Sequence, residues 1–317
     1  MRLIFMGTPE FAVSSLSRLV ADGHTVAAAF TQPDKPAGRG NKLLQPPVKV
    51  FALEHGITVF QPSRIKTNPD VRATFEAIVP DACVVAAYGK ILPEWMLSIP
   101  RLGCINIHAS LLPKYRGAAP INWAIANGER ETGVTIMQMD AGLDTGAMLA
   151  RRALEILEDE TAGELSARLA ELGAGLLSET LPRLELGEIR PVPQDNTEAT
   201  FAPMLSRDDG IIDWSQTASQ IANRIRAFQP WPGCHTMLGR HRLIVWRAYA
   251  GGAAQTTERP DVPPATITGL NKTGITVACG SSTQLSIEEL QIEGKRRLPA
   301  RDVANGLRLT PGSHISG

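Results

Sequence analysis

Short apolar runs alternate with helical patterns along the first half of the chain. Prolines near the starts and glycines past the ends of the helical stretches fit the usual preferences of helix termini. The predicted strands are Arg2–Met6, Thr25–Phe30, Thr58–Phe60, Ala82–Ala86 and Gly103–His108, and the predicted helices are Pro9–Asp22, Pro47–His55, Asn68–Ile78 and Pro120–Asn127. Short apolar strands separated by helices are typical of βαβ units. The pattern therefore predicts an α/β fold with a Rossmann-like, mainly parallel sheet.

Two more strands and a long helix follow in the sequence. Val134–Asp140 and Met148–Glu155 show partial alternation, and Thr161 with Glu164 forms a capping box that predicts a helix start. Gly187 suits the end of this helix. Its apolar stripe consists of leucines on one face, at positions Leu165, Leu169, Leu172, Leu176, Leu177, Leu181 and Leu184. We interpret the stripe as the side of the helix that packs in the domain core.

Periodicity fades between residues 188 and 206, where three prolines indicate a linker. A helix is predicted over Ser215–Phe228. The short β-rich runs after it are Cys234–Met237, Arg242–Tyr249, Ala265–Gly269, Gly274–Ala278 and Gln284–Glu293. Short strands at this spacing suggest a small OB-like β-barrel. We therefore expect a catalytic domain over residues 1–189, a linker over 190–206 and a C-terminal β-barrel domain over 207–317.

The composition is ordinary, but charge is distributed unevenly along the chain. The 317 residues have a formal net charge of zero and 43% hydrophobic residues, as in ordinary globular proteins. Residues 1–206 hold 19 Lys and Arg against 23 Asp and Glu, whereas residues 207–317 hold 13 against 9. The basic C-terminal part suits a polyanionic partner, although an offset of this size also arises by chance.

Location, thiols and assembly state follow from what the sequence lacks. No apolar run approaches the roughly 20 residues that span a bilayer, and the N-terminal apolar stretch is too short for a signal peptide. We therefore expect a cytoplasmic protein. The four cysteines form no Cys-x-x-Cys pair and the histidines no ligand pair, so we expect buried thiols and no metal. Without an exposed apolar stripe, a monomer is expected.

Asn106 and His108 are the strongest candidates for chemistry. They lie two residues apart at the end of a predicted strand, so both side chains point to the same face. An amide that can polarise a carbonyl would then lie beside an imidazole that can transfer a proton. Asp144, in the Gly-rich stretch 140–146, is a carboxylate that could orient the imidazole, and Asp140 is a rival for that role. This set suits acyl-type transfer without a covalent intermediate.

Two further segments are candidates for binding. Residues 87–93 follow a strand, so Tyr88, Gly89 and Leu92 could form a wall for a flat heterocycle, with simple packing as the alternative for Tyr88 and Leu92. Residues 34–49 contain four basic side chains against Asp34, together with helix-breaking glycines and prolines. A basic, poorly structured loop of this kind can follow nucleic-acid phosphates, or it can simply be solvated.

With these residues identified, the chain resembles the methionyl-tRNA formyltransferases over essentially its whole length. The resemblance rests on FMGTPEFAV at residues 5–13, TQPDKPAGRG at 31–40, SLLPKYRG at 110–117 and QMDAGLDTG at 138–146. It implies transfer of a formyl group from 10-formyltetrahydrofolate to the α-amine of methionyl initiator tRNA. It assigns catalysis to Asn106, His108 and Asp144. It further assigns folate binding to Ser110, Leu111, Leu112 and Pro113, and acceptor-stem binding to the basic loop with Lys35, Arg39 and Lys42.

Other functions remain open from the sequence. The same folate chemistry could act on another amine, such as glycinamide ribonucleotide or an amino-sugar nucleotide. A catalytically inert RNA-binding protein on the same scaffold is a third possibility. A nicotinamide oxidoreductase is disfavoured, because Gly7 does not begin a Gly-x-Gly-x-x-Gly fingerprint.

Overall fold

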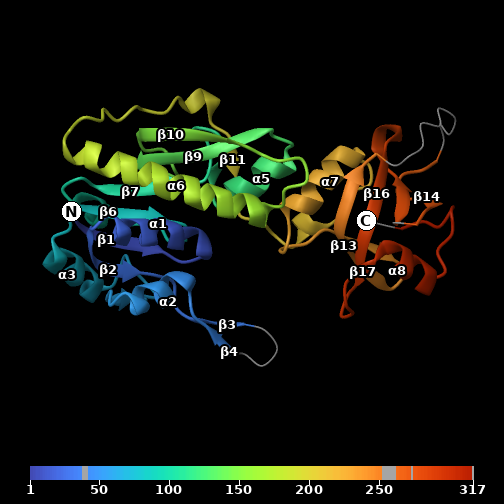
Figure 1. The fold of residues 1–317 in the computed structure, drawn as a ribbon, viewed down its shortest axis with the longest axis horizontal. Helices are drawn as coiled ribbons and strands as arrows, with labels where there is room; N and C mark the ends of the chain where they lie inside the picture. Colours follow the sequence, from blue (N-terminus) through green and yellow to red (C-terminus); the bar gives the residue numbers. More distant parts are fainter. Residues whose placement is uncertain (38–41, 252–261, 273, 316–317) are drawn as a thin grey trace. The chain divides into compact units, whose positions relative to one another are not determined.

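The chain forms two compact units, drawn in Figure 1. The computed structural model describes residues 1–37, 42–251, 262–272 and 274–315. The first unit comprises residues 1–120, 131–155 and 166–203, and the second comprises 121–130, 156–165 and 204–317. Neither unit is one uninterrupted stretch of chain. The domain limits expected from the sequence stay a prediction, because compactness alone does not define a domain that folds independently.

The elements follow one another along the chain as a βα alternation and then as a β-rich region. The first group is β1 (Arg2–Gly7), α1 (Glu10–Ala21), β2 (Thr25–Phe30), β3 (Lys35–Ala37), β4 (Lys42–Leu44), α2 (Pro47–Glu54), β5 (Val59–Phe60), α3 (Pro69–Ile78), β6 (Ala82–Ala86), α4 (Glu94–Ser98), β7 (Cys104–His108), β8 (Arg116–Gly117), α5 (Pro120–Ala126), β9 (Glu131–Gln138), β10 (Met148–Glu155) and α6 (Ala162–Glu185). The second group is β11 (Phe201–Ala202), α7 (Ala218–Ala227), β12 (His235–Leu238), β13 (His241–Ala250), β14 (Ile267–Leu270), β15 (Ile275–Ala278), β16 (Gln284–Ile292), β17 (Leu298–Pro299) and α8 (Ala300–Gly306).

A seven-stranded sheet forms the centre of the first unit. Its order is β10-β9-β7-β6-β1-β2-β5. The five strands from β7 to β5 are parallel to one another, whereas β9 pairs antiparallel with both of its neighbours, β7 and β10. Leu3 to Met6 of β1 are all fully buried, as expected for a parallel strand covered on both faces. The predicted mainly parallel α/β sheet is therefore confirmed.

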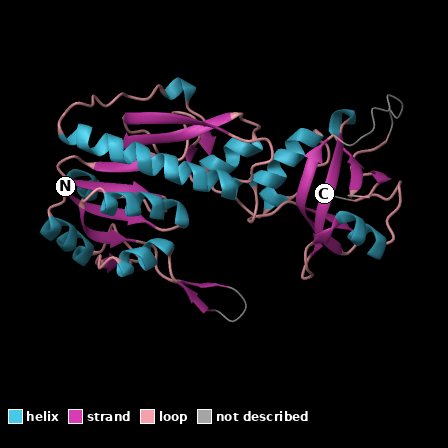
Figure 2. Ribbon diagram, in the orientation of Figure 1, coloured by secondary structure: helices cyan, strands magenta, loops and turns pink. Residues whose placement is uncertain are grey.

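Helix α6 lies alongside the strands of this sheet (Figure 2). Its predicted capping box is present, because Thr161 N–H donates to Glu164 Oε2 at 2.9 Å and Glu164 N–H donates to Thr161 Oγ1 at 3.4 Å. Five of the seven leucines in its stripe are buried, as predicted for a core face: Leu165, Leu169, Leu176, Leu177 and Leu181. A Cβ atom at Gly173 would lie only 2.9 Å from Cγ2 of Ile107 in β7. The helix thus approaches β7 closely because residue 173 has no side chain.

The second unit is built on an antiparallel sheet. Strands β12-β13-β16-β15-β14 form a continuous path, and β17 pairs with β16, giving an antiparallel half-barrel. The predicted helix at Ser215–Phe228 is present as α7, and Ile221, Ile225 and Phe228 are buried as their spacing predicts. The predicted C-terminal β-rich domain is therefore confirmed, as an antiparallel half-barrel.

The basic segment differs from the sequence prediction. Residues 34–49 were expected to be poorly structured, but β3 and β4 pair as an antiparallel hairpin, which Figure 1 shows projecting from the first unit. At its base, Lys49 Nζ forms an ion pair with Asp34 Oδ2 at 2.7 Å. Because short strands rich in Lys and Pro lack the usual β signal, periodicity alone could not predict this hairpin.

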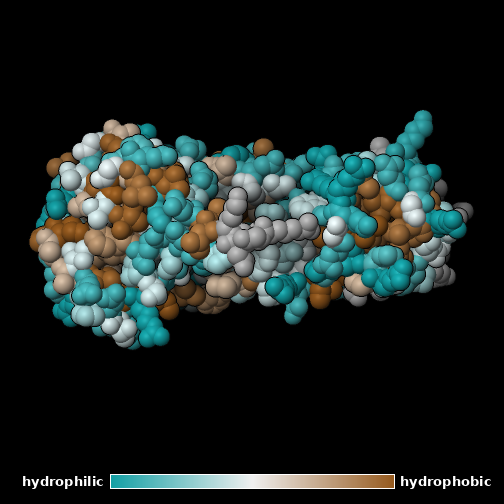
Figure 3. Space-filling view, turned by 90° about the horizontal axis from the view of Figure 1, so that it is seen from below, coloured by the Kyte–Doolittle hydropathy of each residue, from teal (hydrophilic) through white to brown (hydrophobic). Residues whose placement is uncertain are grey.

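The cysteines agree with the sequence prediction. All four cysteines are unpaired and buried, as predicted. None of the helices within the described residues is both long and apolar enough to cross a membrane. The same residues contain no group of three or more His, Cys, Asp or Glu suited to a metal ion. On the face drawn in Figure 3, hydrophobic residues are interspersed with hydrophilic ones.

Two glycines in α6 give opposite stability predictions. We expect Gly173→Leu to lower the free energy of unfolding by about 1–3 kcal/mol, because the new side chain would overpack against Ile107 and Val134. Gly175→Ala should raise it by roughly 0.5–1 kcal/mol, because nothing lies within 4 Å of a Cβ there and Ala is the better helix former. Urea denaturation followed by circular dichroism measures both, and equal effects would contradict the packing argument.

Candidate active site

The parallel strands place the candidate residues at one edge of the sheet. Cys104, Asn106 and His108 alternate along β7 and so share a face, and Cys104 belongs to the hydrophobic core formed with α3 and α4. Asn106 and His108 lie beyond that core, at the carboxyl end of the strand, where open α/β sheets bind ligands. Asn106 is 9% exposed, and its side chain makes no hydrogen bond within the described residues. Its amide is thus available to a ligand.

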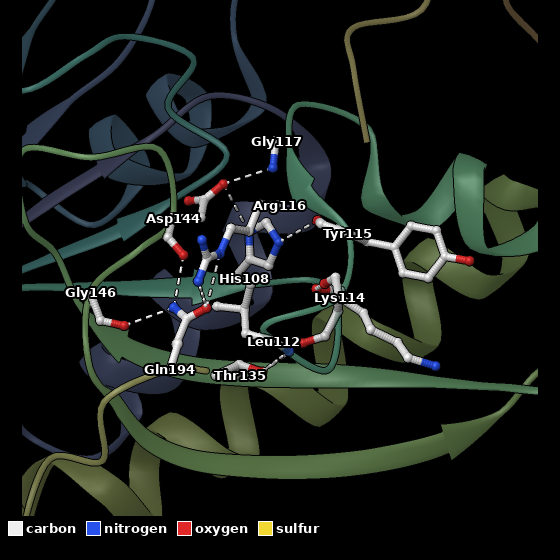
Figure 4. A network of polar contacts seen from close by, with 11 residues as sticks. His108, Leu112, Lys114, Tyr115, Arg116, Gly117, Thr135, Asp144, Gly146 and Gln194 are labelled. Atoms are coloured by element: carbon white, nitrogen blue, oxygen red, sulfur yellow. Dashed lines mark hydrogen bonds and ion pairs between the residues drawn. The ribbon is translucent and has the colours of Figure 1, made fainter. Parts of the chain in front are cut away.

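His108 is buried and held by the backbone of the loop that follows β7. Its Nε2 lies 2.9 Å from the carbonyl oxygen of Tyr115, as drawn in Figure 4. A carbonyl oxygen only accepts, so the neutral imidazole carries its proton on Nε2. The Nδ1 atom then has the free electron pair, and it lies 3.7 Å from Asp144 Oδ2. Nδ1 is therefore the atom that can take up a further proton, facing a carboxylate.

Asp144 and Asp140, the two rivals for the carboxylate role, have different partners. Asp144 Oδ2 accepts a hydrogen bond from Gly117 N–H at 2.9 Å while it faces His108. Asp140 Oδ1 instead accepts from Gly142 N–H at 3.0 Å and from Thr145 Oγ1 at 2.7 Å, within its own loop. Asp140 thus caps a turn. Of the two, only Asp144 lies within ion-pair distance of the imidazole in the described structure.

The predicted folate segment at Ser110–Pro113 is a rigid turn beside His108. Thr135 Oγ1 donates to Ser110 O at 2.7 Å and accepts from Leu112 N–H at 3.1 Å, so β9 fixes the turn. Ser110 Oγ donates to Lys114 O at 2.6 Å. Leu112 and Pro113 are buried and joined by a cis peptide bond, and Leu111 is half-buried. The segment therefore presents mainly backbone and apolar groups.

The other predicted folate residues divide between core and surface. Tyr88 and Leu92 belong to the hydrophobic core of the first unit, whereas Gly89 is exposed. The Tyr88 hydroxyl is buried and has no hydrogen-bond partner within the described residues, and this burial raises its pKa well above the usual value. The packing alternative thus accounts for Tyr88 and Leu92. A contact between this loop and folate stays a prediction.

Of the predicted tRNA-binding residues, Lys35 and Lys42 begin the two strands of the hairpin. Lys35 is exposed. Arg39 lies outside the described residues. Lys35 and Lys42 therefore lie on the same hairpin, and in the sequence this hairpin is far from His108 and Asp144.

Sequence reasoning missed Arg116 and Gln194, which connect the segments of the site. Arg116 is only 4% exposed, and its Nε and Nη2 donate to Gln194 Oε1 at 3.0 and 2.8 Å. Gln194 Nε2 in turn donates to the carbonyl oxygens of Asp144 and Gly146, both at 2.8 Å (Figure 4). Gln194 comes from the stretch interpreted as a linker, so no local pattern could identify it.

A depression of about 390 Å³ borders the loop that contains Asp144. It is lined by Gln138, Met139, Asp140, Thr145, Gly146, Ala147, Pro193, Gln194 and Asn196. Its volume is within the range of small-molecule sites. Neither Asn106 nor His108 is among these residues, so the depression lies beside the candidate chemistry and does not contain it.

Two family models and a known relative match most of this chain. A model of the formyl transferase family matches residues 1–181, and one of the formyl transferase C-terminal domain matches residues 204–308. The chain is 52% identical to the methionyl-tRNA formyltransferase of Geobacter metallireducens over 313 residues, covering 99% of this chain and 98% of that protein.

Solved structures show the same fold at lower identity. An N-formyltransferase from Helicobacter canadensis, in complex with folinic acid and dTDP-3-aminofucose, matches with a TM-score of 0.66 at 18% identity, over 90% of this chain and 98% of that one. HypX from Aquifex aeolicus, in complex with tetrahydrofolic acid, matches with a TM-score of 0.60 at 18% identity, over 96% of this chain and 47% of that one. The two family models and the match over nearly the full length of the Geobacter enzyme show that the chain belongs to the methionyl-tRNA formyltransferase family.

Proposed function

We propose that the protein transfers the formyl group of 10-formyltetrahydrofolate to the α-amino group of methionyl initiator tRNA. The observation that supports this most is the arrangement at His108, with Nε2 on the Tyr115 carbonyl and Nδ1 3.7 Å from Asp144, next to the unengaged amide of Asn106. In a member of this family, these groups meet the three needs of formyl transfer. The reaction needs an oxyanion donor, a proton acceptor and a charge that stabilises the protonated acceptor.

Asn106 supplies the oxyanion donor in this proposal. The amine attacks the formyl carbon, and the formyl oxygen becomes an oxyanion in the tetrahedral intermediate. An amide N–H placed in advance stabilises that charge without reorganising, and a single donor of this kind contributes roughly 10²–10³ in rate. The Asn106 side chain suits this role because it forms no competing hydrogen bond within the described residues.

His108 transfers the proton. The attacking nitrogen loses a proton to His108 Nδ1 as the new C–N bond forms, and N10 of the folate gains one as its bond to the formyl carbon breaks. One proton is thus returned for the one removed. With both ring nitrogens protonated, Nε2 still donates to Tyr115 O and Nδ1 faces Asp144 Oδ2. The Asp144 carboxylate then lies opposite the positive charge of the ring.

The two co-substrates would use different parts of the first unit. The rigid turn at Ser110–Pro113, beside the catalytic residues, suits the folate because backbone groups and apolar walls hold flat heterocycles. Gly89 is the exposed member of the second predicted folate segment, and Tyr88 and Leu92 would support it from the core. The hairpin whose strands begin at Lys35 and Lys42 suits the phosphates of the tRNA acceptor stem, and Arg39 comes between these two residues in the sequence.

A radiolabelled donor tests the proposed function. We expect label from 10-formyltetrahydrofolate to appear on charged initiator methionine tRNA, and far less on charged elongator methionine tRNA. Intact mass measured after incubation with the donor alone should show no formylated protein, because the described site contains no activated Ser or Cys nucleophile. Label on an amino-sugar nucleotide or glycinamide ribonucleotide, or no transfer at all, would contradict the proposal. Location in the cytoplasm and a monomeric state stay predictions.

The carboxylate assignment has a matched pair of variants. We expect Asp144→Asn to lower kcat by about 10²–10⁴-fold, because the protonated His108 would lose its facing charge. Asp140→Asn should change kcat little, because an amide oxygen can still accept from Gly142 N–H and Thr145 Oγ1. Steady-state formylation kinetics measures both. Similar losses in the two variants would exclude a specific role for Asp144.

The hairpin assignment predicts a separation of the two substrates. Arg39→Ala should raise KM for tRNA while the affinity for folate, measured by titration, stays unchanged, because the loop contributes binding and positioning of the tRNA. Arg72→Ala is the control, since Arg72 is exposed on α3 and forms an ion pair with Glu76 of the same helix. An equal loss of folate affinity in the Arg39 variant would argue against separate roles.

A further inference from the structure

Gln194 uses every polar position of its side chain to join two segments of the active site. Its amide nitrogen donates to two carbonyl oxygens, those of Asp144 and Gly146, and its amide oxygen accepts twice from Arg116. The segment around Gln194 is itself anchored to the first unit. Val192 bridges Met148, and Phe201–Ala202 pairs with Arg116–Gly117. The stretch of chain that contains Gln194 is thus fixed at Val192 before it and at Phe201–Ala202 after it.

The first segment held by Gln194 is the backbone of Asp144 itself. Asp144 has a φ of +53°, in the left-handed region that residues with a side chain rarely adopt. Such conformations persist when the surroundings hold them in more than one way. The Gln194 amide holds the carbonyl of Asp144 and that of Gly146 two residues later, so it bonds on both sides of Thr145. The direction of the Asp144 carboxylate depends on this backbone conformation.

The second segment is the loop that contacts the other side of the catalytic pair. Arg116 is buried and has no carboxylate partner within the described residues, so the amide oxygens of Gln194 and Asn196 take its charged hydrogen bonds. Its chain neighbours make the two contacts that define the site. Tyr115 O accepts from His108 Nε2, and Gly117 N–H donates to Asp144 Oδ2.

We propose that Gln194 is a positioning residue that sets the Asp144 carboxylate against His108 by locking the two loops together. The inference rests on the proposed function, because it assumes that the His108–Asp144 pair takes part in formyl transfer. Gln194 acts through Asp144 and Arg116, and it contacts neither reacting atom in this proposal.

Gln194→Glu removes the two hydrogen bonds from the Gln194 amide nitrogen and keeps the contact with Arg116. A carboxylate still accepts from Arg116, but it has no N–H for the carbonyl oxygens of Asp144 and Gly146. We expect kcat to fall by about 10- to 100-fold, as for a misplacement of a catalytic group by about 1 Å, while KM for tRNA stays unchanged. Gln229→Glu is the matched control. Gln229 is also half-buried and donates to two carbonyl oxygens, those of Ile225 and Trp246, in the second unit. Its kcat should stay near that of the unaltered protein.

A double-mutant cycle with Asp144→Asn separates positioning from a general structural role. If Gln194 acts through Asp144, adding Gln194→Glu to Asp144→Asn should lower kcat by less than about 2-fold further. The same 10- to 100-fold loss in both backgrounds would overturn the inference. Full activity of Asp144→Asn alone would contradict the role of Asp144 on which the inference rests. Absence of formyl transfer by the unaltered protein would instead contradict the proposed function, so the failures are distinguishable.

Amide hydrogen exchange of Gly117 gives a readout that does not depend on turnover. Its N–H donates to Asp144 Oδ2, so it should exchange faster in Gln194→Glu and not in Gln229→Glu. Unchanged exchange would overturn the inference. If Gln194→Glu fails to fold, Gln194→Met serves in the same cycle, because Met has similar length and no amide. Failure of both variants to fold would assign Gln194 to stability and overturn the positioning role.

Discussion

The hydrogen bond between His108 Nε2 and the carbonyl oxygen of Tyr115 is the contact on which the site depends. It selects the tautomer and so decides which ring nitrogen can exchange a proton. It also decides that this nitrogen faces Asp144 at 3.7 Å. The separation is longer than a hydrogen bond, so the backbone carbonyl orients the ring and the carboxylate acts on it as a charge.

That contact is supported by structure that reaches far along the chain. Tyr115 N–H donates to Thr200 Oγ1, Arg116 N–H donates to Thr200 O, and Gln194 joins Arg116 to the Asp144 loop. Beneath the site, the sheet holds β7 in place, and α6 can approach it closely because residue 173 is Gly. The catalytic groups thus rest on a rigid scaffold, and rigid support preserves geometry better than loops alone.

The catalytic pair and the proposed tRNA-binding residues lie on different kinds of structure. The buried pair of His108 and Asp144 needs precise placement, and the sheet with its connecting loops provides it. A polyanion is attracted over longer distances and tolerates looser placement, which suits a projecting hairpin with basic residues. The excess of basic residues after residue 206 in the sequence falls in the second unit.

Local patterns in the sequence were enough to predict the mainly parallel sheet, the leucine face of α6 with its capping box, and Asn106 with His108 on one strand face. Each depends on residues within a few positions of one another, where periodicity and capping chemistry act. The different contacts of Asp144 and Asp140, the Tyr115 carbonyl as the partner of His108, and the reach of Gln194 came from the folded chain. The side-chain contacts of His108, Asp144 and Gln194 join residues 7 to 78 positions apart, and several of them use a backbone oxygen, a group that every residue has. No pattern of side chains marks such an atom, because its role follows from where the fold brings it.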